Sequence, residues 1–241
     1  MVPDLTGSFT VGLRHILGGN LVGAYVYGAA AFADGTPLGD VDFHVIVRQP
    51  LDECERAALE ELHEELARDF PPLGAELDGY YLLLEDAQRR KPPQSQMWAR
   101  ATDTAWALHR AHILAGRCIV LYGPDPATIY PLTDWPELEA ALWSELDFVE
   151  RHLHDYPAYC ILNLCRLIYS FRMGDVVVSK TAAAAWALEH LPAWRRHFNL
   201  AQKSYAGQAT AEDQAFMHSE VQRFYKFALA RIKKNARVEK P

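Results

Sequence analysis

Residues 21–47 read LVGAYVYGAAAFADGTPLGDVDFHVIV, and this stretch decides the fold of the N-terminal half. Its two ends, residues 21–27 and 40–47, are rich in the β-branched and aromatic residues that are typical of strands. Gly28 stops the first run, and residues 34–39 (DGTPLG) carry the glycine and proline that are typical of a turn. The sequence therefore predicts two strands that are joined by a turn.

Asp40 and Asp42 stand at the start of the second predicted strand. Because side chains alternate along a strand, both carboxylates project from one face and their apolar neighbours from the other. Two carboxylates held side by side repel each other, and oxygen ligands of this kind suit Mg²⁺, which substrate phosphates then complete. Taken alone, Asp-x-Asp more often marks a solvated turn, so the magnesium interpretation depends on the elements that follow.

The following elements supply a third carboxylate. Residues 52–69 (DECERAALEELHEELARD) predict a helix capped by an aspartate, and residues 76–84 (ELDGYYLLL) predict a third strand. Glu76 and Asp78 are two residues apart and share one face of that strand, so either one could join a metal or act as a base. Residues 117–122 (RCIVLY) predict a fourth strand.

From Trp135 onward the pattern has the period of helices and almost no strand signal. We place a domain boundary within Pro131 to Pro136 and expect two domains, residues 1–132 and 133–241. The expected fold class is therefore an α/β (α+β) domain followed by an all-α helical bundle.

Composition excludes several classes of protein. The 241 residues are 50% hydrophobic and carry a net charge of −7, which is typical of a globular chain and argues against a nucleic-acid partner. The four cysteines have no zinc-like spacing and are expected to be reduced. No segment is apolar enough for a secretory signal or a membrane span, so we expect a cytoplasmic protein that acts away from the membrane.

Two blocks of sequence resemble a known family. Tyr27-Gly28-Ala29 followed by Gly39-Asp40-Val41-Asp42 resembles the Gly-Ser and Ser-Asp-x-Asp pattern of the nucleotidyltransferase superfamily typified by DNA polymerase beta. Residues 164–170 (LCRLIYS) and 179–192 (SKTAAAAWALEHLP) resemble the helical domain of the streptomycin/spectinomycin adenylyltransferases. Because the blocks occur in the same order as in the family, the resemblance covers nearly the whole chain.

The resemblance implies a Mg²⁺-dependent transfer of AMP from ATP to a hydroxyl of an aminoglycoside or aminocyclitol antibiotic such as spectinomycin or streptomycin. It implies an active site between the two domains of a monomer, with two magnesium ions, and a resistance function. It also implies a role for each matching residue: Asp40, Asp42 and Asp78 as metal ligands and catalytic residues, Asp78 as base with Glu76 in reserve, and Gly28, Ala29, Gly39 and Lys180 as nucleotide-binding residues.

The chain departs from the family at three positions. Ala29 and Gly39 replace serines, which deletes two hydroxyls able to bond phosphate, and Asp78 replaces a glutamate and shortens the base by one methylene. Two alternatives therefore stay open: a non-catalytic relative that only binds nucleotide or ligand, and a nucleotidyltransferase with a different acceptor, such as a protein hydroxyl. Trp98 and Trp106 are candidates for an acceptor-binding tryptophan, although neither has the family spacing.

The histidines permit a further interpretation. His44 shares the face of the two aspartates, where it either faces the site or forms part of the core edge. His109 and His112 are three residues apart on a predicted helix, but the sequence shows no third ligand beside them, so we expect no zinc site.

Overall fold

The computed structural model describes residues 2–32, 38–98 and 102–236. Most of the predicted turn at 34–39 therefore lies outside the described residues. Contacts divide the chain into two units: the first reaches Phe32 and continues from Leu38 to Thr133, and the second begins at Asp134. Each unit has its own buried core.

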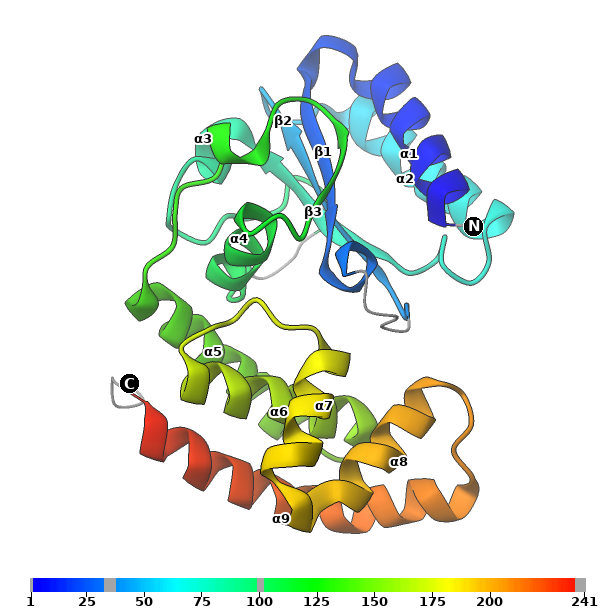
Figure 1. Ribbon diagram of the computed structural model, residues 1–241. Coiled ribbons are helices and arrows are strands. Elements are labelled where there is room, and N and C mark those ends of the chain that lie inside the picture. Colours follow the sequence, from blue (N-terminus) through cyan, green and yellow to red (C-terminus); the bar gives the residue numbers. More distant parts are fainter. Residues whose placement is uncertain (1, 33–37, 99–101, 237–241) are drawn as a thin grey trace. The chain divides into compact units, whose positions relative to one another are not determined.

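The first unit is built on a mixed sheet (Figure 1). In the described residues the strand order is β3-β2-β1-β4, with β1 antiparallel to both β2 and β4 and with β2 parallel to β3. The predicted strands are confirmed to within two residues at their ends. Their bounds are β1 Leu21–Tyr27, β2 Val41–Val47, β3 Leu77–Leu83 and β4 Ile119–Tyr122.

One face of this sheet is covered by α1 (Val2–Leu17) and α2 (Glu53–Asp69), which lie side by side in Figure 1. Leu5, Phe9 and Leu13 of α1 are fully buried and recur every four residues, so they form one helical stripe. They belong to the same core cluster as Val41, Phe43, Val45 and Val47 of β2. α1 adds an element that the sequence analysis did not predict.

The opposite face of the sheet packs against α4 (Trp106–Leu114) and the residues after the short 3₁₀ turn Pro126–Thr128. A short helix, α3 (Leu84–Ala87), follows β3 directly. The core on this face is rich in aromatic side chains, which include Tyr25, Tyr27, Trp106 and Tyr130. By register, Tyr25 and Tyr27 lie opposite His44 and Asp42, so the predicted metal ligand Asp42 projects from this aromatic face.

The second unit is helical throughout its regular elements, as predicted. Pro157 opens α6, which packs against α5, α7, α8 and α9 and forms the centre of this unit. A capping box at Thr210 starts the last helix, which continues to Asn235. The bounds are α5 Trp135–Arg151, α6 Pro157–Met173, α7 Lys180–His190, α8 Arg195–Tyr205 and α9 Ala211–Asn235.

Two further predictions concern membrane-spanning segments and the state of the cysteines. None of the helices in the described ranges combines the length and the apolarity needed to cross a membrane. The four cysteines are free thiols, of which Cys160 and Cys165 are buried and Cys54 is exposed.

The first prediction concerns α2, whose first turn follows β2 and leads to the parallel strand β3. Asp52 caps it: Asp52 Oδ1 accepts a hydrogen bond from Glu55 N at 2.8 Å, and Glu55 Oε2 accepts one from Asp52 N at 3.0 Å. We expect Asp52→Ala to lower the free energy of unfolding by about 1 kcal/mol, because backbone N–H groups lose their acceptor. Urea unfolding measures this.

The control is Asp52→Asn, which keeps an oxygen acceptor of the same reach and should unfold close to wild type. Equal losses in both variants would contradict the capping role and would point to the charge of Asp52 instead.

Candidate functional site

The parallel pairing of β2 and β3 brings two predicted site residues together. Asp42 and Asp78 are register partners, so their Cα atoms lie opposite each other on adjacent strands. Partners in a parallel pair project from the same face of the sheet. Asp42 is partly buried and Asp78 is exposed, so this carboxylate pair faces solvent at the sheet margin.

The other two predicted carboxylates, Asp40 and Glu76, lie two residues earlier in the chain, just before the same two strands. Asp40 precedes β2 by one residue and Glu76 precedes β3 by one residue, and Val41 N donates a hydrogen bond to Glu76 O at 2.9 Å. Asp40 is partly buried, whereas Glu76 is exposed. Hard oxygen donors gathered on two neighbouring strands fit the ligand chemistry of Mg²⁺, which keeps several waters and takes few protein ligands.

Gly28 lies directly against the Asp42 carboxylate. It begins the 3₁₀ turn Gly28–Ala31 with a φ of +66°, and a Cβ built on it would stand 1.8 Å from Asp42 Oδ2. The left-handed backbone and this close approach both require glycine. Ala29 follows in the same turn and is partly exposed, while a Cβ on the exposed Gly39 would meet nothing within 4 Å.

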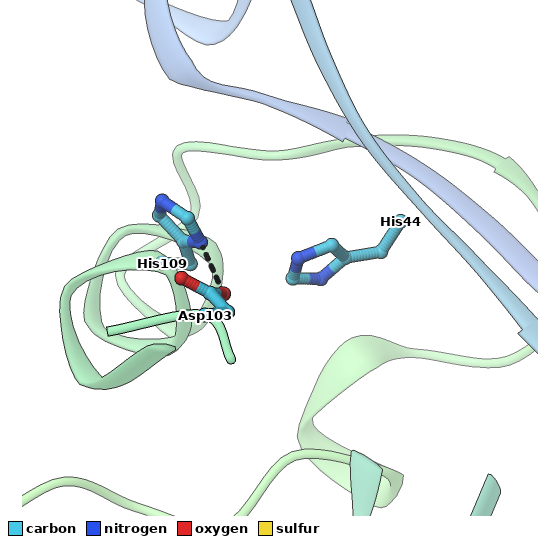
Figure 2. Close-up of side chains that lie close together, drawn as sticks. All are labelled: His44, Asp103 and His109. Atoms are coloured by element: carbon cyan, nitrogen blue, oxygen red, sulfur yellow. Dashed lines mark hydrogen bonds and ion pairs between the residues drawn. The ribbon is translucent and has the colours of Figure 1, made fainter. Parts of the chain in front are cut away.

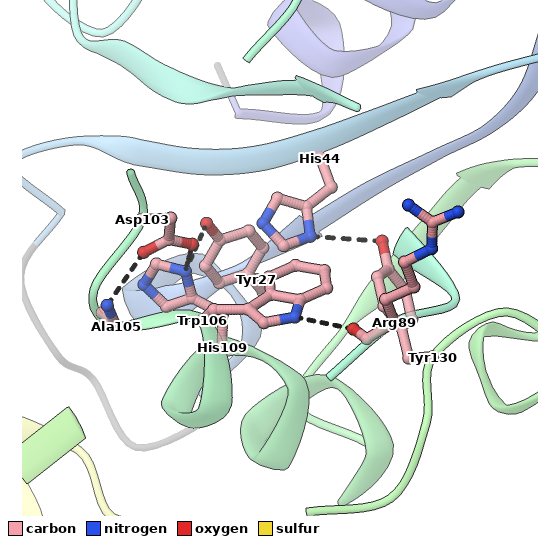
Figure 3. Close-up of polar contacts among 8 residues, drawn as sticks. All are labelled: Tyr27, His44, Arg89, Asp103, Ala105, Trp106, His109 and Tyr130. Carbon is pink, nitrogen blue, oxygen red and sulfur yellow. Dashed lines mark hydrogen bonds and ion pairs between the residues drawn. The ribbon is translucent and has the colours of Figure 1, made fainter. Parts of the chain in front are cut away.

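A set of polar side chains lies among the aromatic residues on the same face of the sheet as Asp42 (Figure 3). Asp103 Oδ2 is 3.0 Å from His109 Nδ1, and Tyr27 Oη is 3.4 Å from the same nitrogen. Burial, together with the carboxylates of Asp42 and Asp103, raises the pKa of Tyr27 well above its ordinary value. Tyr27 therefore carries a protonated hydroxyl next to the carboxylate site.

His44 is fully buried between β1 and β3 on this same face. Its Nδ1 lies 3.2 Å from the hydroxyl of Tyr130. Burial lowers the pKa of His44 to about 3, so the imidazole is neutral near pH 7. Its Nε2 has no hydrogen-bond partner among the described residues.

Figure 2 shows His44, Asp103 and His109 facing one another. One ligand atom from each of these residues lies within 4.8 Å of those of the other two. Burial on its own would raise the pKa of Asp103, but the charge and hydrogen bond of His109 bring it below the ordinary value. Asp103 is therefore an ionised carboxylate although its side chain is only 3% exposed.

This cluster was missed by sequence reasoning. Asp103 precedes α4 and shows no pattern that separates it from other loop aspartates, and His44 is far from it in the chain. The sequence shows no third ligand beside His109 and His112. In the structure His44 and Asp103 lie close to His109, and His112 is not part of this group.

Lys180, the predicted phosphate ligand, is the first residue of α7 in the second unit. Its ammonium lies 4.5 Å from the centre of the Tyr159 ring and 3.4 Å from Tyr205 Oη. The side chain is half-buried, so the ammonium is held against two tyrosines instead of extending into water.

The two tryptophan candidates are not in an exposed position beside the carboxylates. Trp106 is buried, and its Nε1 donates a hydrogen bond to Arg89 O at 3.1 Å, so its ring offers no exposed face to an acceptor. Trp98 is 38% exposed but packs on His63 and Tyr81, which belong to the face covered by α2.

Comparisons with known proteins identify a matching family model, similar sequences and a similar solved structure. Residues 134–231 match the family model of the aminoglycoside adenylyltransferase C-terminal domain. Spectinomycin 9-adenylyltransferases of Staphylococcus aureus strains Mu50 and N315 are each 25% identical over 228 residues, covering 81% of this chain and 82% of the relative. The crystal structure of spectinomycin adenyltransferase AAD(9) from Enterococcus faecialis with ATP and spectinomycin matches with a TM-score of 0.77 and 18% identity, covering 95% of this chain and 98% of that one.

These matches confirm the predicted resemblance and the predicted fold class. The relatives also belong to the predicted class of enzyme, the nucleotidyltransferases.

The contact between Gly28 and Asp42 generates a second prediction. Gly28→Ala should lower the free energy of unfolding by at least about 1–2 kcal/mol, because an L residue is strained at positive φ and the new methyl displaces the Asp42 carboxylate. Thermal and urea unfolding measure the loss.

Gly39→Ala is the matched control within the same sequence motif. Since its Cβ meets no neighbour and its φ lies outside the left-handed region, its stability should stay close to wild type. If the two variants unfolded alike, the close approach of Gly28 to Asp42 would be wrong.

Proposed function

Because residues 134–231 match the family model of the aminoglycoside adenylyltransferase C-terminal domain, we propose that this chain transfers AMP from ATP to a hydroxyl of an aminocyclitol antibiotic. Spectinomycin is the first choice of acceptor, since the curated relatives are spectinomycin 9-adenylyltransferases. Streptomycin is the second. The observation that supports the proposal is the register pairing of Asp42 with Asp78, with Gly28 directly against the Asp42 carboxylate.

The proposed reaction is a displacement at the α-phosphorus of ATP. The acceptor oxygen forms a new bond to the α-phosphorus, the bond to the bridging oxygen of pyrophosphate breaks, and the hydroxyl proton passes to a carboxylate of the enzyme. The products are the adenylylated antibiotic and pyrophosphate. ATP as co-substrate makes the cytoplasm the expected place of action.

Asp40 and Asp42, together with Asp78, are the residues that would hold Mg²⁺. When bound, Mg²⁺ supplies positive charge that offsets the charge on the attacking and leaving oxygens. The absence of a Cβ on Gly28 leaves room for the Asp42 carboxylate. The fit rests on the hard oxygen chemistry of these carboxylates and on their position at the starts of two paired strands.

We assign Asp78 as the base that accepts the hydroxyl proton. Its strand position opposite Asp42 supports this role, whereas the reserve candidate Glu76 precedes the strand by one residue. Both side chains are exposed, so an acceptor hydroxyl can reach either one. Exposure therefore does not distinguish the two carboxylates, and the assignment of Asp78 depends on its register position opposite Asp42.

The nucleotide-binding role is assigned to the Gly28–Ala31 turn, to Gly39 and to Lys180. Ala29 has no hydroxyl, so this turn can offer phosphate only backbone N–H groups. The half-buried ammonium of Lys180 supplies a compact cation with three donors, which suits a triphosphate.

The third prediction tests the reaction as a whole. With ATP, Mg²⁺ and spectinomycin, wild type should release pyrophosphate and yield an antibiotic whose mass is increased by one adenylyl group. Asp42→Asn should lower kcat by roughly 10²–10⁴-fold, because a metal-binding carboxylate contributes several kcal/mol of charge stabilisation. Coupled pyrophosphate release and mass spectrometry provide the two readouts.

Glu85→Gln is the control, because this carboxylate belongs to α3 beyond the far end of β3 and pairs with Arg89 at 3.1 Å. It should keep wild-type turnover. ATP binding without release for any aminocyclitol or aminoglycoside would replace the proposal with a binding role. Release that appears only with a protein acceptor would replace the antibiotic by a protein hydroxyl.

The fourth prediction separates Asp78 from Glu76. Asp78→Asn should lower kcat by about 10²–10⁴-fold, which is the usual contribution of a general base. Glu76→Gln should leave kcat nearly unchanged, and Asp78→Glu should retain more activity than Asp78→Asn because it restores a carboxylate. The reverse pattern for Asp78 and Glu76 would assign the base to Glu76.

A further inference from the structure

We propose that His44, Asp103 and His109 form a second metal site, which binds a transition-metal ion of the Zn²⁺ type. The site is distinct from the carboxylate pair of Asp42 and Asp78. Two imidazoles and one carboxylate are the ligand set that Zn²⁺ takes in open, three-ligand sites with water in the fourth position.

The geometry of the three residues suits a tetrahedral ion. One ligand atom from each residue lies within 4.8 Å of the other two, and Asp103 Oδ2 is 3.0 Å from His109 Nδ1 (Figure 2). Neighbouring ligands on a tetrahedron with bonds of 2.0–2.1 Å are about 3.3 Å apart. Small movements of side chains would therefore complete the site.

His44 provides an independent observation. Its Nε2 is fully buried, has no hydrogen-bond partner in the described parts of the chain, and points toward Asp103 and His109 in Figures 2 and 3. A buried nitrogen without a partner costs free energy unless something else satisfies it. A metal ion on the lone pair of Nε2 would satisfy this nitrogen.

The surroundings of His44 match those of a metal-binding histidine. Its other nitrogen, Nδ1, lies 3.2 Å from Tyr130 Oη, and a donated Nδ1–H at this position would leave the lone pair on Nε2. Metal-binding histidines commonly use their second nitrogen in this way, which fixes both tautomer and ring orientation. The buried hydroxyl of Tyr130 thus supports the ligand geometry.

The donor set favours a transition metal over Mg²⁺. Imidazole nitrogens suit Zn²⁺, whereas Mg²⁺ prefers carboxylate, phosphate and water oxygens. The His109 side chain is 25% exposed, so an ion has a route from solvent to the otherwise buried cluster. When bound, the ion would connect β2 to Asp103 and to α4.

The fifth prediction is a metal titration of the full chain after chelator treatment. We expect Co²⁺, used as a spectroscopic substitute for Zn²⁺, to produce the visible d–d absorption of a four-coordinate site in the presence of excess Mg²⁺. One equivalent of Zn²⁺ should displace it and should raise the melting temperature, because an ion that binds only the folded state stabilises it.

Three variants locate the site. Asp103→Asn keeps the shape of the side chain but removes its charge, and His44→Gln removes the buried imidazole, so both should abolish the Co²⁺ spectrum. Tyr130→Phe removes only the partner of His44 Nδ1 and should weaken Co²⁺ binding by about 10–100-fold, as losses of supporting hydrogen bonds usually do. Circular dichroism of each variant checks that it is folded.

Two controls separate this site from other histidines and from the carboxylate pair. His112→Gln changes a histidine of the same helix outside the cluster, and Asp42→Asn changes the carboxylate site, so both should bind Co²⁺ like wild type. A Co²⁺ spectrum that survives in folded Asp103→Asn or that disappears in Asp42→Asn would overturn the proposal. So would the absence of any spectrum in wild type, which would leave a hydrogen-bonded Asp–His pair.

Discussion

The parallel pairing of β2 with β3 is the constraint on which the rest of the first unit depends. A parallel pair needs a long crossover, and the capped helix α2 provides it. Because the side-chain period of a strand is two residues, a slip of one residue would turn Asp42 into the apolar core under α1 and α2 and would turn Phe43 to the face that now carries Asp42. The buried row Val41, Phe43, Val45 and Val47 opposes such a slip and so holds the Asp42–Asp78 register.

That constraint also explains why β2 has two different faces. One face is purely apolar and packs on α1 and α2, so hydrophobic burial stabilises it without polar partners. The other face carries Asp42 and His44 among tyrosines. The neighbours of these polar groups, Gly28, Tyr130 and Asp103, each come from a different segment of the chain. The candidate site and the histidine cluster therefore both lie on this face of the sheet.

Local pattern was sufficient for much of this architecture. Alternation and turn residues predicted β1, β2 and β3, and parity placed Asp42 and Asp78 on comparable faces, because both follow from neighbours in sequence. α1 was not predicted, although Leu5, Phe9 and Leu13 recur at helical spacing. The cluster of His44, Asp103 and His109 could not be predicted, since it depends on how α4 packs over the sheet and no periodicity reports that contact.

The close approach of Gly28 to Asp42 explains what the departures from the family pattern change and what they leave in place. A serine after Gly28 would offer a hydroxyl, but the position of Asp42 depends on the missing Cβ of Gly28 and not on the residue that follows it. Ala29 can therefore replace serine without moving the Asp42 carboxylate. Under the proposed function, the loss is confined to one hydrogen bond toward a phosphate, about 1.5–3 kcal/mol. A substitution at Gly28 itself would disturb both the backbone and the carboxylate. Gly28 is thus the position that the fold cannot change. Under the proposed function, the hydroxyls that are missing beside it alter the strength of nucleotide binding and not the construction of the site.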